Sequence, residues 1–374
     1  MGKWLGIHSS PSLSARTRAA LTLVPTHCET RRRTHPLARV LFLGLSGAFL
    51  PLIASAHEVY VLDTATITRA MSMTSPNPFT AIIGNEFEFL FWGFVSFVVF
   101  STVITASFFH VLEKRLDPML FAMKRYALPV ARITTGLCVI AFAYAGNIYG
   151  SELFLSSFFG SMTTLFQYAL GVVGILLTVG LFTRPVSYAL LALYAYSAFT
   201  LGIYAFTYTD FLGAFALTAI LGGGIWSLDS MRSVRAPGFI HTLQPYAFPF
   251  LRICLGWGVL FASIYAKYMY SQLALEVVIQ HDLVRFFPFD PLFIVLGALI
   301  IEFIIGLMLI FGVAIRWTLL FLAFWLTLSL LYFQELIWPH GILFGLAITL
   351  FLHGYDRYSL EGYFFKKHGR EPVL

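Results

Sequence analysis

The chain has 374 residues, of which 59% are hydrophobic and 11% are charged, and its mean hydropathy is +0.81. A soluble globular chain is nearer half apolar and a quarter charged, so these values exclude an ordinary water-soluble enzyme. Apolar runs of about twenty residues recur along the chain, and that length suits a membrane-spanning helix. The sequence therefore predicts an all-α, polytopic integral membrane protein with the lipid bilayer as its main partner.

The formal net charge is +6, from 24 Lys and Arg against 18 Asp and Glu. Membrane topology explains this excess better than binding to nucleic acid, which we do not expect. The three cysteines, Cys28, Cys138 and Cys254, are far apart and form no Cys-x-x-Cys motif. Neither a disulfide framework nor a zinc site is therefore predicted.

The N-terminus has the order of a targeting segment. A basic run, RRRTHPLAR, precedes an apolar stretch at 40–53 and a small-residue cleavage motif at 54–56. This order is typical of a secretory signal peptide and predicts His57 as the first mature residue; the alternative is an uncleaved signal anchor. Residues 1–30 fit either a transit peptide or a gene start placed too far upstream, and we prefer the second interpretation. We treat 1–56 as a targeting region.

Hydropathy and length predict nine membrane-spanning helices after the signal peptide. They lie near residues 89–111, 129–148, 164–183, 185–206, 211–228, 247–270, 291–315, 317–335 and 340–355. Each is about long enough to cross a hydrocarbon core of ~30 Å at a rise of ~1.5 Å per residue. A short extracytoplasmic segment, 57–88, precedes an anchoring helix and cytoplasmic loop at 89–128.

The positions of the basic residues predict the orientation. If His57 is outside, alternation of the helices places most basic residues in the cytoplasm, as the positive-inside rule requires. These residues are Lys114, Arg115, Lys124, Arg125, Arg132, Arg184, Arg232, Arg235, Arg252, Arg316, Arg357, Lys366, Lys367 and Arg370. Only Arg69, Lys267 and Arg285 lie on the outer side of the mature chain. We expect a bacterial or archaeal plasma membrane, with the N-terminus outside and the tail 356–374 cytoplasmic.

Two motifs recur along the chain. Arg132-Ile133-x-x-Gly136 is repeated as Arg252-Ile253-x-x-Gly256, an offset of 120 residues. The set Gly174, Gly180 and Arg184 is repeated as Gly306, Gly312 and Arg316, an offset of 132. A longer loop in the second copy accounts for the change of offset. Each motif begins or ends a predicted helix on the cytoplasmic side.

A third correspondence, at an offset of 130, pairs Asp210 with His340 and Gly224 with Gly354. Residues 129–228, called the first half below, and 247–355, called the second half, are therefore predicted to be two copies of one four-helix bundle. Four helices are an even number, so the copies are parallel, unlike the inverted repeats of many transporters. A cytoplasmic linker, 229–246, joins them.

The second half also contains the series Glu302, Gly306, Leu309, Gly312 and Arg316. Together with the Arg-Ile-x-x-Gly opening, this series resembles the DoxX/DoxD family of four-helix membrane proteins. The resemblance covers 129–354 and implies that Lys267 is the family's lysine near the end of its first helix. The first half departs from the pattern, because Asn147 replaces the lysine and Leu170 replaces the glutamate.

The resemblance implies a function as well as a fold. The family includes the membrane subunit of a thiosulfate:quinone oxidoreductase, so we expect a membrane component of a respiratory or sulfur redox system that exchanges electrons or protons with quinone. No motif in the sequence binds haem, flavin or an iron–sulfur cluster, so quinone is the one cofactor expected, and other redox subunits are the expected partners. The alternatives are a non-catalytic scaffold or assembly subunit and, third, a transporter of a small solute or metal.

Glu302 and Lys267 are the candidate catalytic residues. Glu302 lies near the middle of a predicted helix, where an ionised carboxylate costs about 2.5–3.5 kcal/mol on insertion scales. It must be protonated, paired or next to a polar cavity. The functional interpretation is a proton-accepting group beside a quinone, and the structural alternative is a side chain that ties two helices by hydrogen bonds. A pair with Lys267 requires staggered helices; otherwise Lys267 extends to the interface.

Other polar residues form weaker candidates. A substrate-binding group above Glu302 would consist of His340, Glu335, Arg285 and His281, and the alternative interpretation of these residues is solvated helix caps. Arg132, Arg184, Arg252 and Arg316 are interpreted as structural anchors and topology signals at helix ends that also hold the inner face of the bundles together. His57, with its α-amine and the downstream Met71 and Met73, would suit copper, although no second histidine is near.

Overall fold

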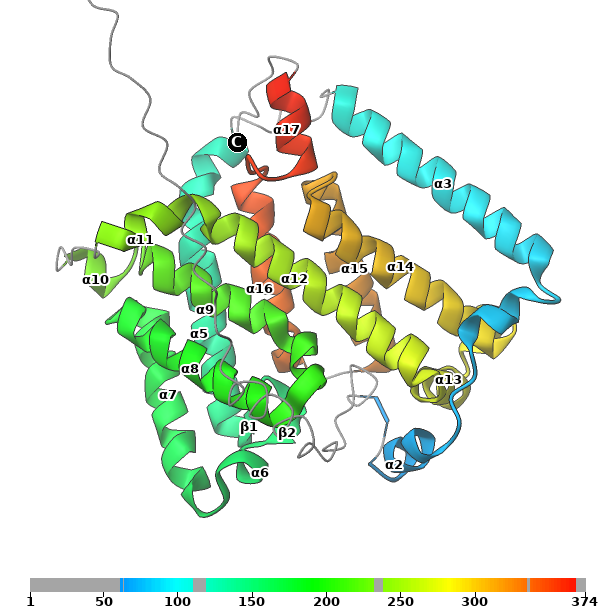
Figure 1. Ribbon diagram of the computed structural model, residues 1–374, viewed down its shortest axis with the longest axis horizontal. Coiled ribbons are helices and arrows are strands. Elements are labelled where there is room, and N and C mark those ends of the chain that lie inside the picture. The colour runs from blue at the N-terminus through cyan, green and yellow to red at the C-terminus, as the bar shows by residue number, and fades with distance from the viewer. Residues whose placement is uncertain (1–60, 63, 110–118, 232–237, 335–336, 368–374) are drawn as a thin grey trace, which may run out of the picture. The chain divides into compact units, whose positions relative to one another are not determined.

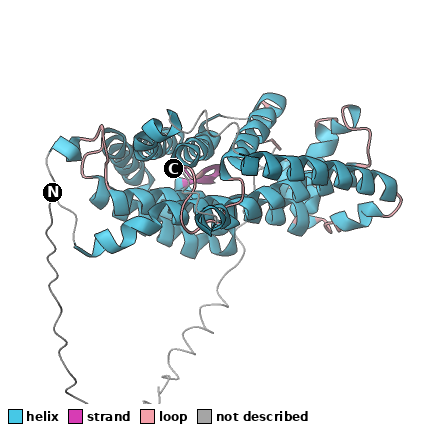
Figure 2. Ribbon diagram, turned by 90° about the horizontal axis from the view of Figure 1, so that it is seen from above, coloured by secondary structure: helices cyan, strands magenta, loops and turns pink. Residues whose placement is uncertain are grey.

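A computed structural model describes residues 61–62, 64–109, 119–231, 238–334 and 337–367. Within these ranges the fold is almost entirely helical. Two short strands, β1 (Asn147–Ile148) and β2 (Gly150–Phe154), pair as one antiparallel hairpin, which Figure 2 shows among the helices.

Long helices make up both halves of the chain. The first half contains α5 (Ala127–Ala145), α7 (Thr163–Val179), α8 (Thr183–Leu201) and α9 (Thr209–Leu221), and the second contains α12 (Ala247–Ile264), α14 (Pro291–Phe311), α15 (Ile315–Phe333) and α16 (Ile337–His353). A further long helix, α3 (Glu86–Phe109), precedes them (Figure 1). Each of the nine segments expected to be helical overlaps one of these helices.

Seven helical stretches among the described residues are long and apolar enough to cross a membrane. One of them, Thr183–Leu221, contains both α8 and α9, and α16 is a shorter apolar helix. The prediction of an all-helical membrane protein is confirmed at this level. That nine helices span the bilayer stays a prediction, as does the signal peptide, which lies outside the described residues.

Short elements connect the long helices. They are α2 (Thr64–Ser72), η2 (Pro78–Ile82), η3 (Lys124–Tyr126), α6 (Leu155–Phe159), η4 (Gly160–Met162), η5 (Gly202–Tyr208), α10 (Leu228–Met231), α11 (Gly238–Leu243), η6 (Gln244–Tyr246), η7 (Tyr265–Met269), α13 (Ser271–Gln280), η8 (Leu283–Arg285) and α17 (Leu360–Lys367). Of these, η7 is a turn of π-helix, and the other η elements are 3₁₀ turns. Three connecting segments, β1–β2, η5 and η7, carry polar side chains that are described below.

Two glycines end equivalent helices in the same way. Gly180 follows α7 with φ of 71° and Gly312 follows α14 with φ of 69°, a left-handed conformation that favours glycine. The N–H of the next residue then bonds back into the helix, from Leu181 to Leu176 at 2.9 Å and from Val313 to Met308 at 2.9 Å. Each glycine is therefore needed to stop the helix next to a buried arginine.

Glycines also bring helix pairs into close contact. A Cβ atom at Gly136 of α5 would lie 2.9 Å from the carbonyl oxygen of Gly174 in α7. A Cβ at Gly256 of α12 would lie 2.8 Å from the carbonyl oxygen of Gly306 in α14. Small residues that let backbones approach are a common basis of helix association in membranes. The repeated spacing of these glycines in the two motifs thus serves packing.

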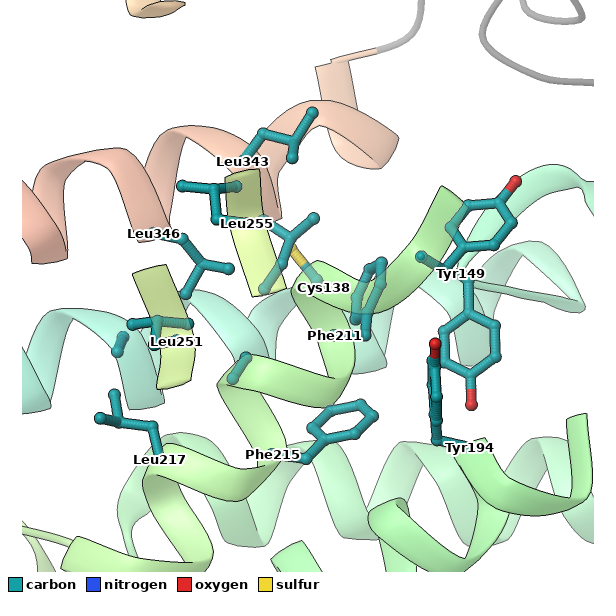
Figure 3. Packing of buried hydrophobic residues seen from close by; sticks show 14 of the residues in the cluster. Cys138, Tyr149, Tyr194, Phe211, Phe215, Leu217, Leu251, Leu255, Leu343 and Leu346 are labelled. Carbon is teal, nitrogen blue, oxygen red and sulfur yellow. The ribbon is translucent and has the colours of Figure 1, made fainter. Parts of the chain in front are cut away.

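The two halves share one hydrophobic core. Helix α9 packs more extensively on α12 than on α5 of its own half, and α16 packs more extensively on α5 than on α12. Figure 3 shows the result, with Cys138 and Phe211 of the first half against Leu255 and Leu343 of the second. The two four-helix segments are therefore not packed as separate bundles, because the last helix of each half packs against the first helix of the other.

Helix α3 makes few contacts with the other described helices. No side chain in its stretch Glu86–Val103 is buried. It is attached through η2, which packs on α14, and through an edge-to-face contact of Trp92 with Phe289, whose ring centroids are 6.3 Å apart. Apart from this attachment, its apolar surface faces the surroundings, which suits an anchoring helix.

Candidate functional site

Lys267 and Glu302 form an ion pair. The Nζ atom of Lys267, in η7, lies 2.9 Å from Oε2 of Glu302, in α14. The side chains are only 12% and 18% exposed, so the rest of the protein largely covers the pair. The two helices are thus staggered in the way that the pair requires.

Trp325 occupies the other carboxyl oxygen. Its indole Nε1–H, from α15, donates a hydrogen bond to Oε1 of Glu302 at 3.2 Å. Both oxygens of Glu302 therefore have partners on different helices. Removing one partner from a buried charge pair is strongly unfavourable, so the three side chains form one interdependent group, called the Glu302 triad below.

A π-helical turn places Lys267 on this side of its helix. In η7 the N–H of Tyr270 bonds to the carbonyl of Tyr265 at 3.0 Å, five residues back instead of four. One extra residue in a turn rotates the following side chains by about 100° relative to an α-helix. Such turns are rare and frequently occur at functional sites. Lys267 lies within this π-helical turn, and from there its side chain reaches Glu302 in α14.

The triad lies near the edge of the helix assembly. Phe321 stacks on Trp325 with ring centroids 6.5 Å apart and an interplanar angle of 21°. Phe321 and Phe324 are exposed, as is Phe303 on the turn of α14 next to Glu302. In a bilayer these aromatic rings would contact lipid. The indole of the triad is thus in contact with an aromatic ring at the exposed surface.

The residues expected to form a substrate site above Glu302 lie in different environments. His340 is 1% exposed and lies in the first turn of α16. His281 ends α13, where its carbonyl accepts a hydrogen bond from Tyr332 at 2.8 Å, and Arg285 is exposed in η8. Glu335 lies outside the described residues. The grouping of these four residues into one substrate site stays a prediction.

Arg132 binds the end of a neighbouring helix. Its Nη1 donates to the carbonyls of Leu177 at 2.9 Å and Thr178 at 2.5 Å, the last turn of α7. Its Nη2 donates to the carbonyl of Trp226 at 2.9 Å. Because the last carbonyls of a helix have no partner within it, a buried guanidinium is a suitable donor. Arg132 is fully buried and is a structural residue in this arrangement.

Arg252 makes the same contacts in the second half. Its Nη1 donates to the carbonyls of Leu309 and, at 2.7 Å, Ile310, the last turn of α14. Its Nε forms an ion pair with Oδ2 of Asp356 at 2.8 Å, and both side chains are buried. The structural interpretation of these arginines therefore fits both halves, and of the two only Arg252 has a carboxylate partner among the described residues.

The other two arginines lie at the beginning of the third helix of each half. Arg184 Nη2 donates to the carbonyl of Leu221 at 3.4 Å, and Arg316 Nε donates to that of Phe351 at 3.4 Å. The guanidinium of Arg316 also lies over the ring of Tyr355. Both contacts tie the end of the last helix to the third, which agrees with a role in packing.

A second polar cluster was missed by the sequence analysis. Oε1 of Glu152, in β2, accepts hydrogen bonds from Tyr204 at 2.9 Å and from Tyr208, and the two hydroxyls lie 3.3 Å apart. Burial raises the pKa of Glu152 to about 8, against an opposing effect of the Tyr204 hydrogen bond. The only signal in the sequence is the spacing of the tyrosines, four residues apart, which reveals nothing about a distant glutamate.

Metal ligation finds no support in the described part of the chain. No group of three or more His, Cys, Asp or Glu side chains there could hold a metal ion. His57, the candidate for copper, lies outside the described residues. Cys138 and Cys254 are free and buried in the core, where they act as small apolar side chains.

Comparison with known proteins gives no match to a family model, a curated protein or a solved structure. The resemblance to the DoxX/DoxD family therefore rests on the motif residues quoted above. A function has to be argued from the sites themselves.

Proposed function

We propose that the protein is a DoxX-like membrane component of a respiratory or sulfur redox system that exchanges protons and electrons with quinone. The observation that carries this proposal is the Glu302 triad, a carboxyl group held by a lysine and an indole inside a helix of apolar residues. An intramembrane acid is costly, and such residues commonly serve binding or proton transfer.

The chemistry of the triad suits a quinone head group. Reduction of a quinone to a quinol takes up two electrons and two protons, and the protons must reach the two ring oxygens where water is scarce. Lys267 has ammonium hydrogens to donate to a quinone oxygen, and Glu302 lies beside it to pass on a proton. Trp325 orients the carboxyl group. A partner redox subunit supplies or removes the electrons.

The position of the triad supports a substrate dissolved in the membrane. Exposed Phe321 stacks on Trp325, and exposed Phe324 contacts Phe321. Aromatic rings provide a stacking surface for a planar ring, and the apolar surroundings suit an isoprenoid tail. The thiosulfate:quinone type of activity implied by the resemblance is consistent with such a substrate.

The tandem DoxX-like organisation belongs to the same proposal. Contacts match at the offsets found in the motifs: Arg132 and Arg252 differ by 120, and the carbonyls that they bind, in Leu177 and Leu309, differ by 132. The paired contacts favour two copies of one four-helix unit, joined by the linker 229–246.

The glycines that follow the last helix of each half suggest a different pairing from the one predicted from the sequence. Gly222 and Gly354 both follow the last helix with φ of 78° and 77°, and each N–H bonds four residues back. The pairing of Gly354 with Gly222, an offset of 132, therefore fits better than its pairing with Gly224. His340 then corresponds to Tyr208, and Asp210 no longer has a polar counterpart.

The proposed orientation in the membrane places the two ends of the helices on different sides. With nine spanning helices and the N-terminus outside, Glu302 and Trp325 lie near the membrane midplane, Lys267 lies toward the outer side, and the four helix-end arginines lie on the cytoplasmic side. The expected location is a bacterial or archaeal plasma membrane, with the tail 356–374 in the cytoplasm.

The second candidate function is a scaffold or assembly subunit. The exposure of α3 favours it, because a helix that packs on little of its own chain has a free surface for a partner. In that case the triad would only tie α12, α14 and α15 together.

The experiment that separates these functions is purification from the native membrane in mild detergent. Bound quinone and copurified proteins are identified by mass spectrometry in wild type, Glu302→Gln and the control Glu276→Gln, which alters a carboxylate on α13. The proposal expects quinone in wild type and the control and its loss in Glu302→Gln. A stable partner complex without quinone, unchanged in Glu302→Gln, would establish the scaffold.

A further inference from the structure

The hairpin β1–β2 folds Glu152 over η5. A Cβ at Gly150 would lie 2.7 Å from both Oε1 of Glu152 and the hydroxyl oxygen of Tyr208, so the carboxyl group occupies the space that a larger residue at this position would need. Oε1 accepts from both Tyr204 and Tyr208, while Oε2 is buried and has no hydrogen-bond partner among the described residues. The carboxyl group is thus enclosed on one side by hydroxyls and on the other by apolar surroundings.

Among the described residues, Glu152 has no cationic partner. Within the described residues, no ion pair involves Glu152. The titratable side chains near it are Tyr149 of the hairpin, Tyr194 of α8, Tyr204 and Tyr208 of η5, Asp210 of α9, and Tyr265 of η7. The cationic side chain of η7, Lys267, is paired with Glu302. Tyrosine hydroxyls are neutral at physiological pH, and Asp210 would add only negative charge. None of these groups neutralises an ionised carboxylate, so a proton is the ligand that the cluster fits.

We propose that Glu152, Tyr204 and Tyr208 form a proton-binding site, separate from the Glu302 triad, in which one proton is taken up and released by the Glu152 carboxyl group. The two hydroxyls stabilise the carboxylate that remains after release, because both donate to the same oxygen. The site does not depend on quinone chemistry at Glu302.

The cluster also contacts the turn that carries Lys267. The ring of Tyr204 lies 5.2 Å from that of Tyr265, the first residue of η7, between centroids. Release of the proton would place a negative charge on an oxygen that is hydrogen-bonded to Tyr204, the residue in contact with this π-turn. The proton site thus joins the hairpin of the first half to the polar turn of the second.

Infrared difference spectroscopy on the full-length protein in lipid nanodiscs tests the site. The carbonyl stretch of a protonated carboxylic acid is followed during a pH titration of wild type, Glu152→Gln, Glu302→Gln, Tyr204→Phe and Tyr194→Phe. We expect a band that titrates near the raised pKa of about 8, disappears in Glu152→Gln and remains in Glu302→Gln.

The tyrosine variants provide the second readout. Tyr204→Phe removes a donor to the carboxylate, so the titration midpoint should rise. Tyr194→Phe is the matched control, because its hydroxyl donates to the carbonyl of Ala205 and not to Glu152. The two variants test the site even if Glu152→Gln fails to fold. A band unchanged by Glu152→Gln, or equal midpoints in the two tyrosine variants, would overturn the proposal.

Discussion

The two halves of the protein share an inner framework and differ in their polar chemistry. In both, an arginine near the start of the first helix binds the last carbonyls of the second helix, which ends at a left-handed glycine. In the second half Arg252 Nε pairs with Asp356, whereas Arg132 Nε is buried without a partner among the described residues. The position equivalent to Asp356 is Gly224, which has no side chain to offer.

The opposite ends of these helices differ more. The second half has Lys267 and Glu302, and the first half has Asn147 and Leu170 at the same offsets. The first half instead gathers Glu152, Tyr204 and Tyr208, which share hydrogen bonds without a cation among the described residues. The carbonyl-binding arginines make the same structural contacts in both halves, whereas the polar residues at the opposite helix ends differ between the halves. One half holds a charge pair and the other a neutral acid.

The largest expected effect comes from separating the charge pair. Glu302→Leu leaves the Lys267 ammonium group buried without its carboxylate, and we expect a loss of about 3–5 kcal/mol in the free energy of unfolding. The double variant Lys267→Met with Glu302→Leu should recover most of it, because no charge is then buried. Unfolding in detergent measures both, with Glu276→Gln as control. A double variant no more stable than Glu302→Leu would show that the pair is not coupled.

The two arginines give a matched comparison of the halves. Arg252→Met should destabilise the protein by about 1–3 kcal/mol more than Arg132→Met, because it alone leaves a buried carboxylate, that of Asp356, without its partner. The same unfolding assay compares the two variants. Equal losses would mean that Asp356 contributes nothing beyond the shared contacts with helix carbonyls.

A pH-dependent difference in stability should reveal the neutral acid of the first half. The pKa of Glu152 is raised from 4.5 to about 8, so its burial favours the protonated form. Its contribution to stability is complete below about pH 4.5 and is lost as the pH rises to about 8. Relative to Glu152→Gln, wild type should lose about 2 kcal/mol between pH 4.5 and roughly pH 6. Melting temperatures that remain parallel over this range would argue against a protonated Glu152.

The smallest expected effect concerns the indole. Trp325→Phe keeps an aromatic ring but removes the hydrogen bond to Glu302, which should cost about 1 kcal/mol. Phe321→Leu, which alters the stacking and leaves that hydrogen bond, is the control. A loss in Trp325→Phe no larger than in Phe321→Leu would show that the indole acts only through packing.

Much of the fold follows from hydropathy alone, because uninterrupted apolar runs of about twenty residues are typical of membrane-spanning helices. Helix ends were less predictable. The expected helix at 164–183 ends at Val179, since Gly180 adopts the left-handed conformation, and the one at 211–228 ends at Leu221 before Gly222. Both glycines were visible in the sequence, but glycine is also common inside membrane helices, so its role as a stop depends on tertiary contacts.

The sites were predictable to different degrees. Glu302 and Lys267 were identifiable because a charge inside an apolar helix is costly and rare. Trp325 was not, since an indole in a membrane helix is usually explained by the interface. Glu152 lies in a connecting segment, where an acid is normally solvated, and only the fold of the hairpin over η5 shows that its carboxyl group is covered. Helix α9 packs on α12 and α16 packs on α5, each in the other half. These are long-range contacts, which no local sequence pattern indicates.

Photolabelling with an azido-quinone shows whether quinone binds beside the Glu302 triad. Purified wild-type protein is illuminated with the probe, with and without excess unlabelled quinone, and the labelled peptides are sequenced by mass spectrometry. The account predicts label on α14 or α15 near Glu302 and Trp325, suppressed by excess quinone and absent in Glu302→Gln. Label confined to other helices, or unaffected by excess quinone, would contradict it.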